Sequence, residues 1–281
     1  MLTNFNAMLR DAYTGGYAVG SFNVYNYETM RGVVDAAKAA GVSSVIVAFG
    51  AKYLTNMSLN DAKALAQSLS DGAGLPVCLH LDHCKDINTV YAAIRAGFGS
   101  VMYDGSALVY EQNAANTRRV CEVAHACGVS VEAELGSLAA GLESHEGSAD
   151  DKEVYTDPEA ARQFVETTDV DALAVSVGTV HGLYKGEPNI RLDILERINA
   201  ACGIPLVLHG GSGIPEETIK ACIARGISKI NVNTEISSYA VKRSKEDLSA
   251  EKLPHLSVLA KNQQGYVAEV VRKYIDFFGG K

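Results

Sequence analysis

Hydrophobic and polar positions along the chain follow a regular order of strand-like and helix-like segments. Eight apolar runs have the length of strands, and continuous runs such as residues 45–49 are typical of parallel strands covered on both faces. Amphipathic stretches of helical length lie between them, for example at residues 28–40 and 59–70. The predicted strands are residues 18–22, 45–49, 77–81, 100–103, 129–134, 172–177, 206–208 and 229–232.

A short phrase, a small or polar residue followed by glycine and an apolar residue, recurs where a predicted helix gives way to a strand. Glycine can close a helix in the left-handed conformation, and the apolar residue then packs back on the last turn. Helix starts are also marked: Ser58 with Asp61 predicts an acidic capping box, and Asp157-Pro158 predicts another cap. The junction glycines are Gly41, Gly97, Gly128, Gly203 and Gly226.

The strict alternation of strands and helices predicts an α/β fold, a closed (β/α)₈ barrel of the TIM type. An open, doubly wound sheet is the alternative. No linker divides the chain, so we expect one domain over residues 1–281, with a C-terminal helical segment at about residues 262–278. The polar stretch at residues 137–152 predicts one long loop after the fifth strand.

Composition narrows the class of protein. Hydrophobic residues make up 47% and charged residues 21%, as in folded soluble proteins. No apolar run approaches the ~18 residues that span a bilayer, and the N-terminus does not resemble a signal peptide, so we expect a cytoplasmic protein without a membrane partner. Acidic residues exceed basic ones by 33 to 25, which argues against a nucleic-acid partner. The six cysteines form no CxxC pair and are expected to be reduced.

Reactive side chains gather just after the predicted strands, where a barrel places its active-site loops on one face. Three neutral imidazoles can hold Zn²⁺ and leave a position open for substrate, so the histidines of this group predict a Lewis-acid site. Each of them, taken alone, could instead be a packing residue. The group consists of Asp82, His83, Asp104, Glu134, His181 and His209.

The other histidines carry less information. His80 precedes Asp82 by two residues and is interpreted as a lining or supporting residue. His125 lies inside a predicted helix, His145 in a polar loop and His255 late in the chain, so we expect no metal there.

A glycine-rich turn, His209-Gly210-Gly211-Ser212-Gly213, separates the seventh predicted strand from a helix that Pro215 begins. Glycines let backbone N–H groups approach an anion, and a helix N-terminus adds partial positive charge, so the turn predicts a phosphate site. A plain tight connection is the alternative. Barrels frequently build phosphate sites from the loops after strands seven and eight, so the predicted partner is the turn at residues 231–234. Gly182, beside His181, is a further candidate donor.

Seven motifs spread over nearly the whole chain carry a family resemblance. They are Phe22-Asn23-Val24, His80-Leu81-Asp82-His83, Val101-Met102-Tyr103-Asp104-Gly105-Ser106, Val131-Glu132-Ala133-Glu134-Leu135-Gly136, Gly178-Thr179-Val180-His181-Gly182, His209-Gly210-Gly211-Ser212-Gly213 and Ile230-Asn231-Val232-Asn233-Thr234-Glu235. Together these motifs resemble the class II aldolases, the family of fructose-bisphosphate and tagatose-bisphosphate aldolases.

The resemblance implies one catalytic zinc ion on His83, His181 and His209, with Asp82 as the general acid and base. Asp104 and Glu134 match carboxylates close to the metal that can hold a second divalent ion or a displaced one, and many relatives also use a monovalent cation. A glutamate in the loop after strand five exchanges the C3 proton in the family; Glu143 is the candidate here, and Glu146 is the alternative. The implied substrate contacts are Asn23, Gly182, Gly210, Gly211, Ser212, Asn231, Val232, Asn233 and Thr234.

The implied reaction is reversible cleavage of a phosphorylated ketose, a ketose 1,6-bisphosphate, to dihydroxyacetone phosphate and an aldehyde, by a homodimer or homotetramer. Many compact relatives bind the distal phosphate with the arginine of an Asp-Pro-Arg segment, whereas this chain has Leu253-Pro254-His255 there. The same chemistry on a ketose 1-phosphate without a distal phosphate is therefore the alternative. Lys252, Lys261, Arg272 or a residue of a neighbouring subunit could replace the arginine.

Two other classes of function compete with the aldolase. A zinc hydrolase on the same barrel would use histidines and an aspartate to activate water, but it would not require a phosphate site. A non-catalytic phosphosugar-binding protein would keep the glycine-rich turn and lose a metal ligand or Asp82. None of these residues is missing from the sequence.

Overall fold

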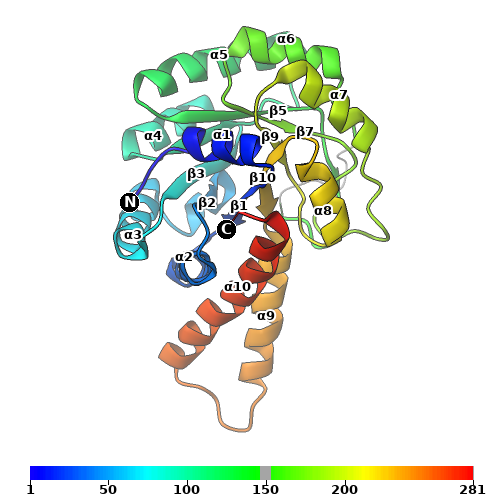
Figure 1. Ribbon diagram of the computed structural model, residues 1–281. Coiled ribbons are helices and arrows are strands. Elements are labelled where there is room, and N and C mark those ends of the chain that lie inside the picture. Colours follow the sequence, from blue (N-terminus) through cyan, green and yellow to red (C-terminus); the bar gives the residue numbers. More distant parts are fainter. Residues whose placement is uncertain (146–152, 281) are drawn as a thin grey trace.

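The computed structural model describes residues 1–145 and 153–280. Eight parallel strands close into a barrel that helices surround (Figure 1). Around the barrel the strands follow the order β1-β10-β9-β7-β5-β4-β3-β2, so every strand has two hydrogen-bonded neighbours and the open doubly wound alternative is wrong. The barrel strands are β1 (Val19–Asn23), β2 (Val45–Gly50), β3 (Val77–Cys84), β4 (Ser100–Tyr103), β5 (Ser130–Leu135), β7 (Ala172–Val175), β9 (Leu206–Leu208) and β10 (Ile227–Val232).

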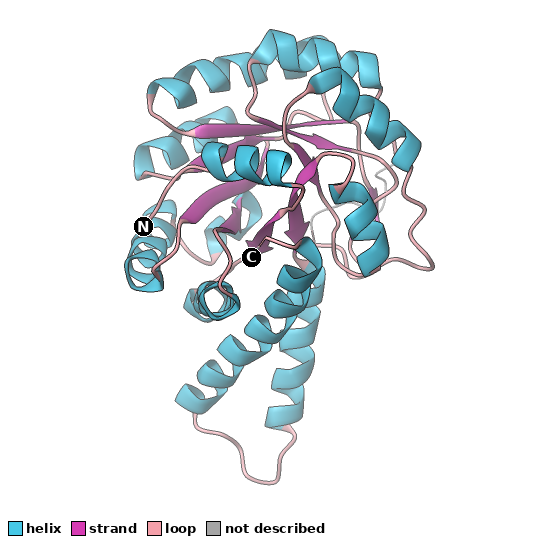
Figure 2. Ribbon diagram, in the orientation of Figure 1, coloured by secondary structure: helices cyan, strands magenta, loops and turns pink. Residues whose placement is uncertain are grey.

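Helices follow the strands and form the outer layer, drawn in cyan around the magenta strands in Figure 2. The predicted signals operate as expected: Ser58 and Asp61 form a capping box, Asp157 caps the helix that Pro158 begins, and all five junction glycines have positive φ. The helices are α1 (Asn6–Gly15), α2 (Tyr27–Ala40), η1 (Ala51–Thr55), α3 (Leu59–Ala73), α4 (Ile87–Ala96), α5 (Tyr110–Ala126), α6 (Pro158–Thr168), α7 (Leu192–Cys202), α8 (Glu216–Ile223), α9 (Thr234–Leu248) and α10 (Leu256–Phe278).

Helix α1 closes the end of the barrel at which the strands begin, and the sequence analysis did not predict it. Phe5, Met8 and Leu9 pack in one buried cluster with Val19 and Ile46, the first inward-facing residues of β1 and β2. A ten-residue helix before the first strand lies outside the strand–helix repeat, so that repeat gives no signal for it. The apolar cluster makes this end of the barrel a packed floor.

The stretch predicted as one long loop after β5 contains secondary structure within its described part, residues 137–145. Strand β6 (Ala139–Ala140) pairs in parallel with β8 (Val180–His181), and isolated bridges join Ser137 to Val154 and Leu142 to Leu183. The loop prediction was therefore wrong for residues 139–140. A two-residue strand has no periodicity of its own and exists only through pairing with a distant segment.

Helices α9 and α10 run side by side and extend beyond the barrel as a hairpin (Figure 1). The predicted C-terminal helix is longer than expected, because α10 begins at Leu256, where His255 caps it. Leu253-Pro254-His255 lies in the connection between the two helices. Helix α10 also packs against α2, which ties the hairpin to the barrel. Among the described residues, no helix has the length and apolarity needed to cross a membrane.

Inward-facing residues recur with a period of two along the strands and change character along the barrel axis. Cys78 lies near the floor, His80 lies one step above it and Asp82 another step above, all buried. Strand β10 places Lys229 and Asn231 at successive inward positions. The interior therefore passes from an apolar floor to a polar, charged opening at the carboxyl ends of the strands.

Candidate active site

Three histidines from different parts of the chain meet at the carboxyl ends of the strands. His83 comes from β3, His181 from β8 and His209 directly follows β9. His209 Nδ1 lies 2.7 Å from His83 Nε2, and one ligand atom of each of the three rings lies within 4.8 Å of the others. The structure therefore brings together the three predicted metal-ligating histidines.

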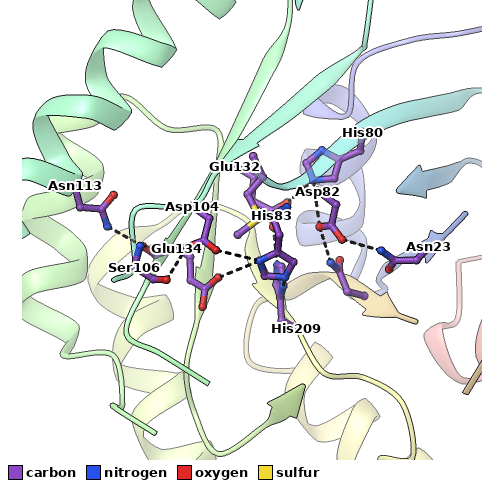
Figure 3. A network of polar contacts seen from close by, with 12 residues as sticks. Asn23, His80, Asp82, His83, Asp104, Ser106, Asn113, Glu132, Glu134 and His209 are labelled. Carbon is purple, nitrogen blue, oxygen red and sulfur yellow. Dashed lines mark hydrogen bonds and ion pairs between the residues drawn. The ribbon is translucent and has the colours of Figure 1, made fainter. Parts of the chain in front are cut away.

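Two carboxylates approach the Nδ1 side of the His83 ring, whereas His209 lies at the Nε2 side (Figure 3). Asp104 Oδ2 lies 3.3 Å from His83 Nδ1, and Glu134 Oε2 lies 3.9 Å from the same atom. Ser106 donates a hydrogen bond of 2.6 Å to Asp104 and helps to hold it in place. His83, Asp104 and Glu134 form a second group with the donor atoms and spacing of a metal site.

Asp82 lies fully buried next to this cluster, with both carboxylate oxygens hydrogen-bonded. Asn23 Nδ2 donates to Oδ2 at 2.9 Å, and Asn231 Nδ2 donates to Oδ1 at 3.1 Å. Burial opposes ionisation of Asp82, but the charges of His83 and Lys229 outweigh burial and lower the pKa of Asp82. Asp82 is therefore a carboxylate at neutral pH, as a general base must be.

The electrostatics of the histidines differ. Burial and the neighbouring His83 lower the pKa of His181 far below its usual range, and burial followed by His83 also lowers the pKa of His209. Burial acts in the same direction on His83, but Asp82 and the hydrogen bond to Asp104 raise the pKa of His83. His181 and His209 are therefore neutral imidazoles with lone pairs to offer a cation.

Glu134 and Asp104 also titrate differently from each other. Burial and the adjacent charge of Asp104 raise the pKa of Glu134 to about 8. For Asp104, burial is outweighed by the hydrogen bond to His83, and its pKa is lowered. When two carboxyl groups share one small site, repulsion between their negative charges is expected to raise the pKa of one above that of the other. A divalent cation would allow both groups to be ionised.

The predicted phosphate loops lie beside each other. The Gly211 N–H donates to the Asn231 carbonyl at 2.9 Å, and the Glu235 N–H donates to Ser212 Oγ at 3.2 Å. These contacts join the turn after β9 to the N-terminus of α9. They also leave the Gly211 N–H bonded within the protein, so this group is not free to bind a phosphate. Gly210 has a φ of 68°, and a Cβ there would lie 2.2 Å from the Val180 carbonyl oxygen, so only glycine fits.

The other predicted substrate residues lie around these loops, all buried: Gly182, Val232, Asn233 and Thr234. Thr234 begins α9, so its backbone lies at the partly positive end of that helix. The Asn233 side chain accepts a hydrogen bond from the Tyr25 hydroxyl through Oδ1 and donates one to the Tyr53 hydroxyl through Nδ2, at 3.3 Å. Asn23 and Asn231 direct their amides at Asp82, so their side chains act on the candidate base.

Glu143 has an exposed side chain, unlike the predicted metal ligands and Asp82, which are buried or partly buried. Glu143 lies in a turn, and its φ is 54°. The Lys52 ammonium donates a hydrogen bond to the His145 carbonyl, two residues further along the same loop. Glu146, the alternative, lies outside the described residues. The role of either residue remains a prediction.

Sequence reasoning missed two charged residues inside the barrel, Glu132 and Lys229. Both side chains have no exposed surface, and Lys229 Nζ lies 2.8 Å from Glu132 Oε2. His80, interpreted as a supporting residue, lies beside them: burial and then Lys229 lower its pKa to about 4, and Ser100 bonds its Nδ1 at 2.8 Å. A charged residue at an inward position of a strand is the signal that could have identified Glu132 and Lys229.

Comparison with known proteins gives a consistent result. The family model described as "Fructose-bisphosphate aldolase class-II" matches residues 3–281. A sulfofructosephosphate aldolase of Alkalicoccus urumqiensis is 41% identical over 82% of this chain and 79% of its own length. A probable fructose-bisphosphate aldolase of Bacillus subtilis is 41% identical over 89% and 87%.

A solved structure of an aldolase has the same fold as this chain. The crystal structure of the YdjI aldolase from Escherichia coli superposes with a TM-score of 0.89 at 35% identity, covering 100% of this chain and 98% of that one. Fold, site geometry and sequence similarity thus point in one direction. The chain belongs to the class-II fructose-bisphosphate aldolase family and is an aldolase, a lyase.

Proposed function

We propose that this protein is a zinc-dependent aldolase that reversibly cleaves a ketose 1,6-bisphosphate to dihydroxyacetone phosphate and an aldehyde. The observation that carries the proposal is the joint placement of His83, His181 and His209 beside the buried, ionised Asp82. A hydrolase would need a base beside a metal as well, but the paired glycine-rich and α9 loops favour a phosphorylated substrate.

The three imidazoles fit a zinc ion. His181 Nε2 is buried and has no hydrogen-bond partner among the described residues, so a ring nitrogen of this histidine is unsatisfied and could serve as a metal ligand. Three imidazole nitrogens and an open fourth position are typical of catalytic zinc, and binding of the ion would displace the proton that Asp82 and Asp104 favour on His83. When bound, zinc supplies positive charge that stabilises the electron-rich oxygen produced by carbon–carbon cleavage. Asp104 and Glu134 would hold a second divalent ion, or the same ion in a displaced position with His83, because a neutral imidazole offers its lone pair to one ion at a time. A monovalent cation is a further candidate.

Asp82 is proposed to take the proton of the C4 hydroxyl during cleavage and to return it during condensation. Its two amide donors, Asn23 and Asn231, fix the carboxylate plane and leave it ionised. The C3 proton of dihydroxyacetone phosphate requires a separate group on the other side of the substrate. Glu143 is our candidate, and its loop would have to bring the exposed carboxylate toward the histidines.

The phosphate of dihydroxyacetone phosphate is assigned to the turn after β9 and the N-terminus of α9. The candidate donors there are the backbone N–H groups of Gly182, Gly210, Ser212, Val232, Asn233 and Thr234. An anion at this position would also gain from the partial positive charge of the helix end.

Substrate choice at the aldehyde end is open to a second candidate, a ketose 1-phosphate without a distal phosphate. Leu253-Pro254-His255 offers no arginine, and it lies in the exposed connection of the α9–α10 hairpin. A relative with 41% identity is named a sulfofructosephosphate aldolase, which indicates that the distal group varies among such proteins. We propose a cytoplasmic homodimer or homotetramer, in which Lys252, Lys261 or Arg272, from the same or a neighbouring subunit, could contact the distal group.

The test is a comparison of kcat/KM for the zinc-loaded protein on ketose 1-phosphates that end in a hydroxyl, a phosphate or a sulfonate. Fructose and tagatose 1,6-bisphosphates represent the phosphate class. A preference for either bisphosphate supports the primary proposal, and a preference for another distal group supports the second candidate. Absence of cleavage for every ketose, with dihydroxyacetone phosphate bound and unreacted, would favour a phosphosugar-binding protein.

A further inference from the structure

A continuous chain of five polar side chains runs through the barrel interior, from a metal-ligating histidine to the candidate base. His209 Nε2 lies 2.8 Å from Glu132 Oε1, and Glu132 Oε2 lies 2.8 Å from Lys229 Nζ. Lys229 donates to Asn231 Oδ1 at 2.6 Å, and Asn231 donates to Asp82 Oδ1 at 3.1 Å. One buried path therefore connects the metal site to the acid–base site.

Lys229 occupies the middle of this path, between two neighbours that serve different sites. Its ammonium is a donor only, so the Asn231 side chain must turn its carbonyl oxygen toward Lys229. The Asn231 amide group then faces Asp82 and donates to it. The orientation of Asn231, and through it one of the two hydrogen bonds to Asp82, follows from the charge on Lys229.

The other arm of Lys229 acts through Glu132. An ionised carboxylate is an acceptor only, so His209 carries its proton on Nε2 and leaves the lone pair of Nδ1 for a metal. That atom is the one that faces His83, at 2.7 Å. Carboxylates that accept a hydrogen bond from a ligating histidine fix its tautomer and ring orientation.

Stability alone does not account for a charged pair at this depth. Glu132 and Lys229 have no exposed side-chain surface, and the desolvation of such a pair often cancels its attraction, so well-packed apolar residues serve stability equally well. The neighbouring inward positions at the floor, such as Val19 and Ile46, are apolar. Lys229 pairs in register with Val19, and from this level the ion pair contacts His209 through Glu132 and reaches Asp82 through Asn231.

We propose that Lys229 is a positioning residue that orients the metal ligand His209 through Glu132 and the base Asp82 through Asn231. The inference rests on the proposed function, because it assigns Lys229 a task in a zinc-dependent aldolase. It predicts that a single substitution at a residue that touches neither metal nor substrate weakens both metal binding and catalysis.

The first variant is Lys229→Met, which keeps a long side chain and removes the ammonium. Zinc affinity, measured by competition with a chelator, is expected to fall by roughly 10- to 100-fold, the usual cost of losing support behind a ligating histidine. The visible spectrum of the cobalt(II)-loaded protein should shift, because His209 is no longer held in one orientation. At saturating zinc, kcat should remain reduced while KM changes little.

The charge-balanced double variant Glu132→Gln/Lys229→Met separates the two arms. The amide carbonyl can still accept a hydrogen bond from His209 Nε2, so most of the zinc affinity should return. Asn231 still lacks its donor, so kcat should stay low. Ser228→Ala is the matched control on the same strand, because the Ser228 hydroxyl bonds only to the Gly226 carbonyl among the described residues and should leave zinc affinity and kcat unchanged.

Wild-type zinc affinity and kcat in Lys229→Met would overturn the inference, and so would full recovery of kcat in the double variant. A double variant that does not fold would assign the pair to stability alone and would overturn it as well. Absence of zinc binding or aldol cleavage in the wild-type protein would instead reject the proposed function. The two failures are therefore distinguishable.

Discussion

The barrel interior and the loop after β5 contribute to the same candidate site in opposite ways. Asp82 is fully buried and held by two amides, and His209 is held by Glu132. Glu143 is exposed, and its loop is tied to the barrel rim by a short pairing with β8 and by the contact between Lys52 and His145. One half of the proposed chemistry is therefore fixed before substrate binds, and the other half is carried by an exposed loop.

This difference indicates what determines the position of each kind of catalytic group. Interior groups such as Asp82 and His209 take their positions from strand register and from hydrogen-bonded neighbours, so they need little reorganisation during the reaction. A loop residue has to be placed by closure of the loop over the substrate. We expect substitutions of interior groups to have larger effects than substitutions in the loop.

Removal of zinc should have the largest effect, because His83, His181 and His209 would lose the ion that they are proposed to hold. A chelator-treated, metal-free sample is expected to show no measurable cleavage of the preferred ketose and to regain it when zinc is added. Circular dichroism before and after treatment serves as the control for folding. Full turnover of the metal-free protein would contradict the proposed mechanism.

Substitution of the base comes next. Asp82→Ala should bind zinc and fold, but kcat for cleavage should fall by ~10²–10⁴-fold, the usual contribution of a general acid–base group. Asp86→Ala is a matched control, since Asp86 caps α4 four residues further along and should cost only ~1 kcal/mol of stability without changing kcat. Near-normal cleavage by Asp82→Ala would remove Asp82 from the role.

The fold was predictable because each of its eight strands carries its own signal. Continuous apolar runs, junction glycines such as Gly41 and caps such as Ser58 are local features, and all appear where expected. Helix α1 was missed because it precedes the strand–helix repeat. Strand β6 was missed because two residues form a strand only through pairing with the distant β8. Local periodicity cannot report such contacts.

The histidine cluster was predictable because the carboxyl ends of parallel strands meet at one face, so residues distant in sequence converge once the strands are known. The supporting pair, Glu132 and Lys229, was not identified, because burial of a charge depends on which face of the strand turns inward. Period-two alternation of Glu132 with Glu134 and of Lys229 with Asn231 contains that information. The position of Glu143 relative to the substrate is not contained in either pattern.

The loop is tested by comparing Glu143→Ala with Glu146→Ala in an isotope-exchange assay of the C3 proton of dihydroxyacetone phosphate. Glu143→Ala should slow exchange by ~10²-fold, near the lower end for an acid–base group because the side chain is exposed, and should weaken binding less. Glu146→Ala acts as the matched variant in the same loop. A larger effect from Glu146→Ala would transfer the role, and no effect from either would reject both assignments.

The smallest effect is expected at the contact between the loop and the rim. Lys52 lies in η1, directly after β2, and its exposed ammonium donates to the His145 carbonyl, so it holds the described end of the Glu143 loop near the site. A hydrogen bond contributes about 0.5–1.5 kcal/mol, which corresponds to a roughly two- to tenfold slower C3 exchange in Lys52→Met. Zinc affinity should not change, because the hydrogen bond that Lys52 makes among the described residues goes to the His145 carbonyl and not to His83, His181 or His209. Unchanged exchange in Lys52→Met, together with a large effect of Glu143→Ala, would show that the substrate alone positions the loop, and it would make the contrast with the barrel interior sharper still.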